Sequence, residues 1–232
     1  MGKLNNIEIQ QRKCNQDANL LSLFYAHRLH IEDPVPSNVI PSCMVSLCTD
    51  ILSLLKHTSV PELLEVIKQS HVPFAIDKAD IPQFSSLEDA ALKVPHLIFA
   101  SQMENITYEQ MGFLLRTEPR TVVADCKYGE NHAKTAAEMG LCAVYKHRVC
   151  LSFLGLLFDE QSEEDKKNLI PKLVLFIPMI QNLFVAGADE NVVNETMSIL
   201  SESTLKRRSP NVWALIDCVN SQLPYELQIH RY

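Results

Sequence analysis

Hydrophobic residues recur every three or four positions along most of the chain, which is the spacing of amphipathic helices. In the first ninety residues this spacing predicts helices over 17–30 and 41–57, and a third helix with Ser59 as its N-cap. Prolines between Val72 and Phe84 predict an extended or irregular stretch, because proline cannot continue a helix. Ser85–Glu88 then resembles a capping box that opens a short helix.

The stretch from 93 to 158 alternates helical and strand-like patterns. Apolar residues predict a helix over 93–102, and Thr107 is the expected N-cap of a second helix. A polar stretch over 117–127 separates this helix from a third over 128–139. The expected buried stripe of the second helix is Ile106, Met111, Leu114 and Leu115.

Two short strands are predicted after the third helix. Gly140 is placed to end that helix in a left-handed conformation, and 141–145 and 149–154 are apolar enough for strands. A basic turn joins the strands. Three helices followed by a two-stranded wing is the element order of a winged helix. The sequence therefore predicts a mainly α fold: a helical region over 1–92, a winged helix-turn-helix over 93–158, and a further helix-turn-helix-like unit over 159–232.

The composition of the 232 residues fits a packed globular protein, with 47% hydrophobic and 21% charged residues. Only six glycines occur, which disfavours a barrel or sandwich with many tight turns and excludes a glycine-rich phosphate loop. Neither a signal peptide nor an apolar run of membrane-spanning length is evident. The seven cysteines form no Cys-x-x-Cys pair, so we expect free thiols in a reducing cytoplasm and no membrane partner.

The net charge of −7 disfavours a generally basic nucleic-acid coat, but the charge is unevenly distributed. Residues 1–105 hold 8 basic and 12 acidic residues, and 159–200 hold 3 and 8. Residues 106–158 hold 6 basic and 5 acidic residues, and 201–232 hold 4 and 3. Contact with DNA phosphates is therefore expected only on the face formed by the second and fourth of these segments.

The predicted third helix carries residues suited to reading bases. Lys127, Asn131, Lys134 and Glu138 lie on one face at helical spacing. Asparagine pairs with adenine, and lysine reaches guanine or phosphate. A solvated surface helix would explain the same face, but the neighbouring basic turn favours nucleic acid.

The C-terminal segment repeats this arrangement. A helix over 189–200 is followed by a turn and a second helix for which Ser203 is the expected N-cap and in which Pro210 is expected to cause a kink or a restart. The hydroxyls of Ser203 and Thr204 and the basic residues Lys206–Arg208 lie at the start of this second helix. Groups of these kinds bind DNA phosphates. The apolar stretch 169–184 is expected to form a shared core helix or a dimer face.

These patterns together resemble the winged-helix modules of bacterial restriction and phage-defence proteins, over about residues 93–220. The resemblance is carried by Tyr128–Leu141, the wing, Leu200–Arg208 and Trp213. It implies a DNA-binding module, alone or beside a nuclease domain. Pro210 departs from the pattern, because the corresponding helices continue unbroken.

Two kinds of metal chemistry are weaker alternatives. Thr121–Lys127 resembles an Asp-x-Lys nuclease strand in which Asp125 would bind Mg²⁺, although Asp125 is equally explained as the N-cap of the next helix. Upstream acids to complete such a site are available at Asp77, Asp80, Glu88 and Asp89. His27, His30, Cys43 and Cys48 have looser spacing than a structural zinc site, so core residues are the simpler interpretation.

The sequence thus favours a protein that binds double-stranded DNA, in a sequence-specific or structure-guided way, without catalytic residues, metal or cofactor. It would be a transcription regulator or the recognition component of a restriction-modification or antiviral defence system, acting as a homodimer or with a partner protein of the same operon. A metal-dependent endonuclease or a non-catalytic protein-interaction module stay open as alternatives. The expected DNA-binding residues are Arg116, Arg120, Lys127, Asn131, Lys134, Lys146, His147, Arg148, Ser203, Thr204, Lys206, Arg207 and Arg208.

Overall fold

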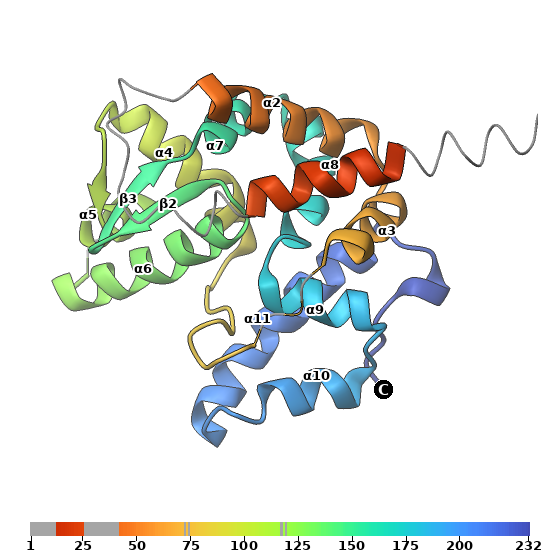
Figure 1. Ribbon diagram of the computed structural model, residues 1–232. Coiled ribbons are helices and arrows are strands. Elements are labelled where there is room, and N and C mark those ends of the chain that lie inside the picture. Colours follow the sequence, from red (N-terminus) through yellow and green to blue (C-terminus); the bar gives the residue numbers. More distant parts are fainter. Residues whose placement is uncertain (1–12, 26–41, 72, 74, 117, 119) are drawn as a thin grey trace, which may run out of the picture.

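The computed structural model describes residues 13–25, 42–71, 73, 75–116, 118 and 120–232. It is mainly helical with one small antiparallel sheet, which confirms the predicted fold class at that level (Figure 1). Residues 13–25 are helical. The other α-helices are α2 (Ser42–His57), α3 (Val60–Ser70), α4 (Val94–Ser101), α5 (Tyr108–Leu115), α6 (Val122–Glu138), α7 (Phe153–Asp159), α8 (Glu163–Val174), α9 (Pro178–Ala186), α10 (Glu190–Met197) and α11 (Glu202–Asn220).

Local capping chemistry sets the starts of α3 and α5, as the sequence predicts. The Ser59 hydroxyl accepts from the backbone N–H of Glu62, whose carboxylate accepts from the Ser59 N–H at 2.8 Å. Thr107 and Gln110 form the same reciprocal pair at the start of α5. At the predicted box near residue 86 the capping group is Ser86, which accepts from the backbone N–H of Asp89 at 3.1 Å and precedes a π-helical turn over Asp89–Lys93.

The helix α6 begins earlier than predicted. It starts at Val122, with the Thr121 side chain accepting from the Ala124 N–H, so the polar stretch expected before it is largely helical. Exposed apolar residues in the first turn hide this start, because they break the amphipathic spacing. Asp125 is therefore not an N-cap, and the proposed Asp-x-Lys strand does not exist.

Backbone-to-backbone packing holds α5 against α6. A Cβ added at Gly112 would lie 1.8 Å from the Asp125 carbonyl oxygen, and one at Gly129 would lie 1.9 Å from the Tyr108 carbonyl oxygen. Only glycine fits at such an approach. The same tight packing leaves one face of α5 outside, so Leu114 is 43% exposed and the prediction that it is buried is wrong.

The sheet has three strands rather than the predicted two. Strand β1 (Ile106–Thr107) pairs with β3 (Arg148–Leu151), which pairs with β2 (Cys142–Tyr145), all antiparallel. A two-residue strand leaves no alternating pattern in the sequence, which is why β1 is not predictable from it. The resulting order is α4, β1, α5, α6, β2, β3. Gly140 ends the helical segment at φ 82°, as expected.

The apolar segment 169–184 forms part of the core. Leu173, Ile177 and Ile180 on and between α8 and α9 are at most 1% exposed, which confirms that the stretch lies in the core, but it belongs to two helices rather than the single helix predicted. Among the described helices, none alone is long and apolar enough to cross a membrane, and the α8–α9 pair, bent by 73°, passes that test by length and composition only.

The C-terminal helix starts earlier than predicted, because the N-cap of α11 is Ser201 rather than Ser203. The helix continues through Pro210, so of the two predicted effects of this proline, a kink or a restart, the restart does not occur. Proline has no N–H, so the carbonyl of Lys206, four residues earlier, lacks its helical hydrogen-bond donor; both residues are exposed, which lets water bond to this carbonyl. Val212 and Trp213, just after the proline, are buried. Burial on one face thus outweighs the local cost of the proline.

Candidate nucleic-acid interface

The outer face of α6 carries the predicted base-reading residues. Lys127 and Lys134 are 60% and 54% exposed, and Asn131 is half-buried between them. Both lysine amines contact the carboxylate of Glu130, at 2.8 and 2.7 Å. Burial raises the pKa of Glu130, but the hydrogen bonds from the two lysines lower it by more, so the pKa lies below its ordinary value. On this face Lys127 and Lys134 are therefore both bonded to the Glu130 carboxylate, a pairing that the helical spacing of the sequence did not predict.

The turn between β2 and β3 is fixed in an unusual conformation. Lys146 and His147 have φ of 44° and 65°, in the left-handed region that favours glycine or asparagine in two-residue hairpins. The turn is held against α5, because the Tyr108 N–H donates to the His147 carbonyl at 3.1 Å and the two rings meet edge to face. The Lys146 amine lies 4.7 Å from the centre of the Tyr145 ring. Both side chains of the turn are exposed.

Two further arginines that the sequence predicts to bind DNA, Arg148 and Arg120, are exposed. Arg148, on β3, is exposed and donates to the Asn105 side-chain oxygen at 2.6 Å. Arg120 is exposed just before α6. Both guanidinium groups are placed where solvent or a ligand can reach them.

Arg116 is not available in this way. Its guanidinium donates to the Asp125 carboxylate at 2.7 Å, with side chains only 18% and 7% exposed, and lies 4.1 Å from the centre of the Tyr128 ring. The pair ties the end of α5 to the first turns of α6. Arg116 is thus a structural residue of the helix pair, and we leave it out of the interface proposed below.

Sequence analysis missed an exposed apolar group at the same end of the helices. Phe113 is 59% exposed at the end of α5, and Val122 and Val123 are 60% and 79% exposed at the start of α6. Exposed apolar residues do not follow the spacing of a buried helix face, so the sequence pattern does not reveal this group. It is recognised only from the structure, in which α6 starts at Val122.

The predicted residues of α11 lie elsewhere. Figure 1 places the first turn of α11 at the bottom of the view, apart from the β2–β3 turn at the left. Lys206, paired with Glu202 at 3.0 Å, and Arg207 are exposed. Ser203 is exposed, and the Ser201 hydroxyl donates to Thr204 at 3.0 Å.

Arg208 points the other way. Its guanidinium donates to the backbone carbonyls of Lys78 and Ile81, at 2.6 and 2.8 Å. Burial, and then the nearby Arg207 charge, lower its pKa. Arg208 therefore fixes the 78–81 loop to α11 and is also left out of the proposed interface.

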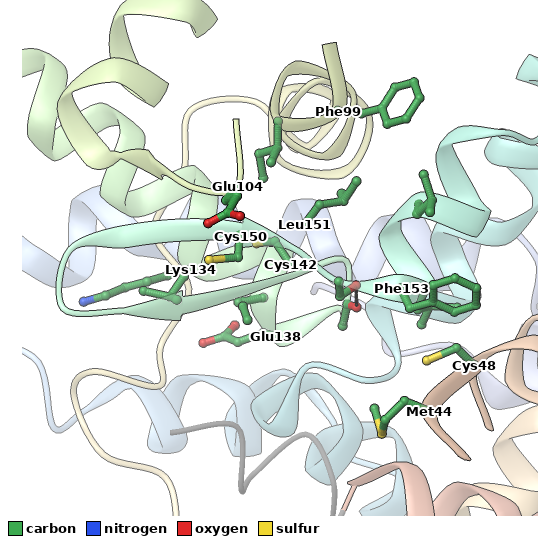
Figure 2. Close-up of a pocket in the computed structure, with 18 of the residues that line it drawn as sticks. Met44, Cys48, Phe99, Glu104, Lys134, Glu138, Cys142, Cys150, Leu151 and Phe153 are labelled. Atoms are coloured by element: carbon green, nitrogen blue, oxygen red, sulfur yellow. Dashed lines mark hydrogen bonds between the residues drawn. The ribbon is translucent and has the colours of Figure 1, made fainter. Parts of the chain in front are cut away.

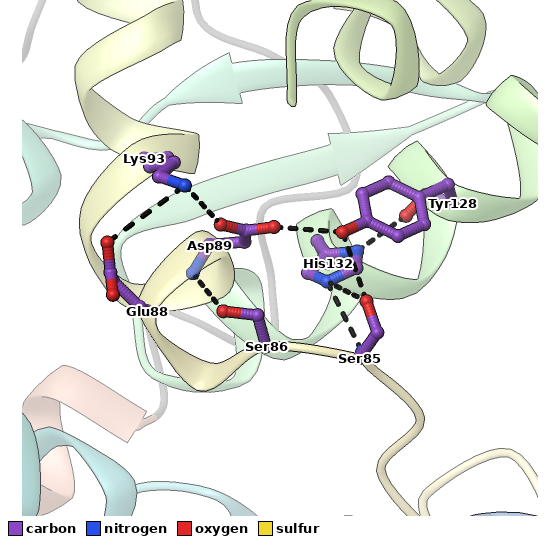
Figure 3. A network of polar contacts seen from close by, with 7 residues as sticks. All are labelled: Ser85, Ser86, Glu88, Asp89, Lys93, Tyr128 and His132. Atoms are coloured by element: carbon purple, nitrogen blue, oxygen red, sulfur yellow. Dashed lines mark hydrogen bonds and ion pairs between the residues drawn. The ribbon is translucent and has the colours of Figure 1, made fainter. Parts of the chain in front are cut away.

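A polar network holds the inner face of α6 (Figure 3). Tyr128 donates to Asp89 at 2.9 Å, and Asp89 pairs with Lys93 at 2.7 Å. His132 is 1% exposed, and its Nδ1 lies 2.8 Å from the Tyr128 carbonyl oxygen, which accepts only, so this nitrogen carries the proton. Its Nε2 then accepts from the Ser85 N–H at 3.4 Å. The network joins the loop at residue 85 and the π-helical turn to α6.

This network makes stability depend on pH through His132. Burial, opposed by the Tyr128 carbonyl and Asp89, lowers the pKa of His132 below its ordinary value, so the folded chain binds this proton less readily than the unfolded chain. We therefore expect the free energy of unfolding to fall as pH drops below about 6.5, the ordinary histidine pKa. Urea unfolding between about pH 5 and 8 measures this, because the ordinary pKa of carboxyl groups, about 4, lies below that range.

The matched variants separate His132 from the other histidines. His132→Gln is expected to flatten the pH dependence, whereas His57→Gln, which removes an exposed imidazole at the end of α2, is expected to leave it unchanged. A slope that survives His132→Gln would show that other groups cause it.

The metal alternatives find no support in the described residues. Asp125 lies on a helix in its pair with Arg116, and the part of the chain that the structure describes contains no group of three or more potential metal ligands. Of the residues considered for zinc, Cys48 is buried, and burial raises its pKa to about 11. His27 and His30 and the side chain of Cys43 lie outside the described residues.

Comparison with known proteins gives no relative: no family model, curated protein or solved structure matches the chain.

Proposed function

We propose that this protein binds double-stranded DNA through α6 and the β2–β3 turn, as a winged helix does. The observation that carries the proposal is the order α4, β1, α5, α6, β2, β3 with the sheet order β1-β3-β2. In Figure 1, α6 and the turn between β2 and β3 lie at the same side of the molecule, and Lys127 and Lys134 of α6 and Lys146 and His147 of the turn are exposed. In such a module the helix enters the major groove and the wing contacts the backbone. A cytoplasmic regulator or a recognition component of a defence system would use such a module.

Within this proposal the exposed residues divide into two roles. Lys127 and Asn131 read base edges, and the exposed Val122 and Val123 contact thymine methyl groups. The phosphates are bound by the remaining exposed cations of the region, Arg120, Lys134, Lys146 and Arg148, and by the exposed imidazole of His147. Glu130 opposes the phosphates, and in the free protein it neutralises part of the positive charge of α6.

The test is fluorescence anisotropy of a mixed-sequence duplex titrated at several salt concentrations. Contact of the four cations Arg120, Lys134, Lys146 and Arg148 with phosphates predicts a log-log salt slope of about −4. Lys127→Ala with Lys134→Ala is expected to weaken binding at low salt by about tenfold or more and to make the slope shallower by about 1, because only Lys134 is assigned to a phosphate. Glu130→Gln is expected to strengthen binding, because it releases both lysines.

The control is Lys68→Ala on α3. It removes one positive charge, against two in the double variant, from a similar lysine–glutamate pair, Lys68–Glu65 at 2.7 Å, on the opposite side of the molecule from the β2–β3 turn (Figure 1). It is expected to leave DNA affinity unchanged. Absence of binding at low salt, or equal losses for Lys68→Ala and the α6 variant, would contradict the proposal.

A second set of variants tests the C-terminal motif. Lys206→Ala with Arg207→Ala changes the exposed cations of α11, where Ser203 and Thr204 also stand. A reduced salt slope would mean that the same duplex reaches α11 as well as α6. An unchanged slope would restrict the interface to α6 and the hairpin.

One observation favours a protein partner instead. Phe113, Leu114, Val122 and Val123 are all more than 40% exposed at the two helix ends that the Arg116–Asp125 pair joins. Exposed apolar groups gathered in this way are typical of protein interfaces. A chain that binds no DNA at low salt but self-associates, and loses self-association on Phe113→Ser, would have this second function.

A further inference from the structure

Ser85 and His132 lie together in the geometry of a nucleophile and its base (Figure 3). The Ser85 hydroxyl is 3.3 Å from Nε2 of His132, and Ser85 is exposed whereas the imidazole is buried. Because Nδ1 donates to the Tyr128 carbonyl at 2.8 Å, Nε2 holds the lone pair that faces the hydroxyl. A hydroxyl beside a base that a third group orients is the arrangement of nucleophilic catalysis, in which distances are often longer before substrate binds.

Two further contacts hold Ser85 in place. Its N–H donates to the same Nε2 at 3.4 Å, and its hydroxyl also lies 3.0 Å from the Tyr128 hydroxyl. Tyr128 gives its own proton to Asp89 at 2.9 Å. The Ser85 proton therefore has two acceptors within reach, and rotation about the Cβ–Oγ bond is enough to direct it to Nε2.

The surroundings of His132 keep its ring in the neutral form that accepts a proton. Burial lowers its pKa most, and the Tyr128 carbonyl and Asp89 oppose this. The cations Arg116 and Lys93 add to the effect of burial. The pKa therefore lies below its ordinary value of about 6.5, and the ring is a base at pH 7. The Asp89 charge favours the imidazolium that forms when the nucleophile gives up its proton.

A helical stretch begins two residues after Ser85 and runs over 87–101. The first N–H groups of a helix have no intrahelical partner and face negative charge favourably. Ser86 binds one of them, the N–H of Asp89, at 3.1 Å. We expect those of Leu87 and Glu88 to donate to the oxygen that becomes negative during attack by Ser85, as backbone N–H groups do in oxyanion holes.

The thiols of a neighbouring part of the molecule are not activated in this way. A cavity of about 920 Å³ beside the sheet is lined by Cys48, Cys142 and Cys150 among others (Figure 2). Burial raises the pKa of Cys48 to about 11 and also raises the pKa of Cys142 and of Cys150. These thiols are neutral at pH 7 and serve as small apolar groups. An electrophile is therefore expected to react at Ser85 rather than in this cavity.

We propose that Ser85 is the nucleophile, and His132 the general base, of a site that hydrolyses carboxylic esters. The Ser85 oxygen forms a bond to the ester carbonyl carbon while its proton passes to Nε2 of His132. The bond from that carbon to the alcohol oxygen then breaks, and the alcohol leaves with the proton. Water, deprotonated by His132, hydrolyses the acyl-serine in the same way and restores the hydroxyl. The proposal does not depend on DNA binding, because it uses none of the residues of the proposed interface.

The test labels the full chain with fluorophosphonate–rhodamine and locates the adduct by mass spectrometry. The serine oxygen bonds to phosphorus, the P–F bond breaks to release fluoride, and His132 takes the serine proton. We expect the adduct at Ser85, with equal rates at pH 7 and 8 and a slower rate below about pH 6.5, where the ring becomes protonated. No adduct at Ser85, or a rate that rises about tenfold from pH 7 to 8 as for activation by hydroxide, would overturn the proposal.

Variants test the pair, and a second serine–histidine pair is the control. Ser85→Ala should remove the adduct, and His132→Gln should slow labelling by about 100-fold or more. Ser53 and His57 on α2 are both exposed, with the hydroxyl 3.5 Å from Nδ1. That Nδ1 donates to the Ser53 carbonyl at 2.8 Å and has no lone pair for the hydroxyl, so Ser53 should stay unlabelled.

Equal labelling of Ser53 and Ser85, or an unaltered rate in His132→Gln, would also overturn the proposal. The position of the adduct and its pH dependence are measured on the unaltered chain, so they need no variant to fold.

Discussion

We expect Gly129→Ala to lower the free energy of unfolding by about 3 kcal/mol, the upper part of the range for overpacking a core. The added Cβ would lie 1.9 Å from the carbonyl oxygen of Tyr108 and 2.6 Å from the backbone nitrogen of Gly112. Both neighbours are backbone atoms, so no side chain can rotate away and α5 must shift relative to α6. Urea unfolding followed by circular dichroism measures the loss, and DNA affinity should fall with it, because the shift displaces α6 from the sheet.

Gly187→Ala is the matched control for this substitution. Gly187 has φ of 62°, and no atom lies within 4 Å of an added Cβ, so alanine there meets only the cost of the left-handed conformation, about 1 kcal/mol. If Gly129→Ala costs no more than Gly187→Ala, the close approach of α5 and α6 is wrong, and with it the geometry on which the proposed interface depends.

The parts of the fold that could be predicted are those that depend on local chemistry. Ser59 and Thr107 each form a capping box with a residue three positions later, and Gly140 ends a helix in the conformation that glycine favours. These interactions involve residues a few positions apart, so their pattern is present in the sequence. The helices and the hairpin follow from the same kind of information.

The parts that could not be predicted depend on contacts between distant segments. Strand β1 is two residues long and exists because β3 provides its partner. The helix α11 continues through Pro210 because Val212 and Trp213 are buried against the rest of the chain. In both cases tertiary contacts override the local preference, and a single sequence does not show them.

The same distinction applies to the candidate interface. The spacing of Lys127 and Lys134 placed them correctly on the exposed face of α6. A count of charges could not show that Arg208 is bonded to carbonyls 127 and 130 residues away. Nor could it show that Arg116 is buried against Asp125, because that pairing depends on how α5 and α6 pack together. The proposed interface therefore contains fewer residues than the sequence predicted, because Arg116 and Arg208 are left out of it.

The second large effect is expected at this buried pair. Asp125→Asn leaves the Arg116 guanidinium, only 18% exposed, without its counter-charge, and we expect it to destabilise the protein by about 3 kcal/mol. Glu202→Gln is the control, because it breaks the Lys206–Glu202 pair, in which the side chains are 76% and 83% exposed, and should leave stability unchanged within error. Chemical denaturation of both variants measures the difference.

The double variant distinguishes a structural pair from a catalytic carboxylate. If Asp125 serves to neutralise Arg116, then Arg116→Met should recover part of the stability lost in Asp125→Asn, because the unpaired buried charge is gone. A metal-dependent nuclease predicts the opposite pattern: Asp125→Asn would remove Mg²⁺-dependent cleavage of a duplex while leaving the unfolding free energy unchanged. Stability loss with recovery in the double variant would assign Asp125 to joining α5 and α6, and a stable, cleavage-deficient Asp125→Asn would overturn that assignment.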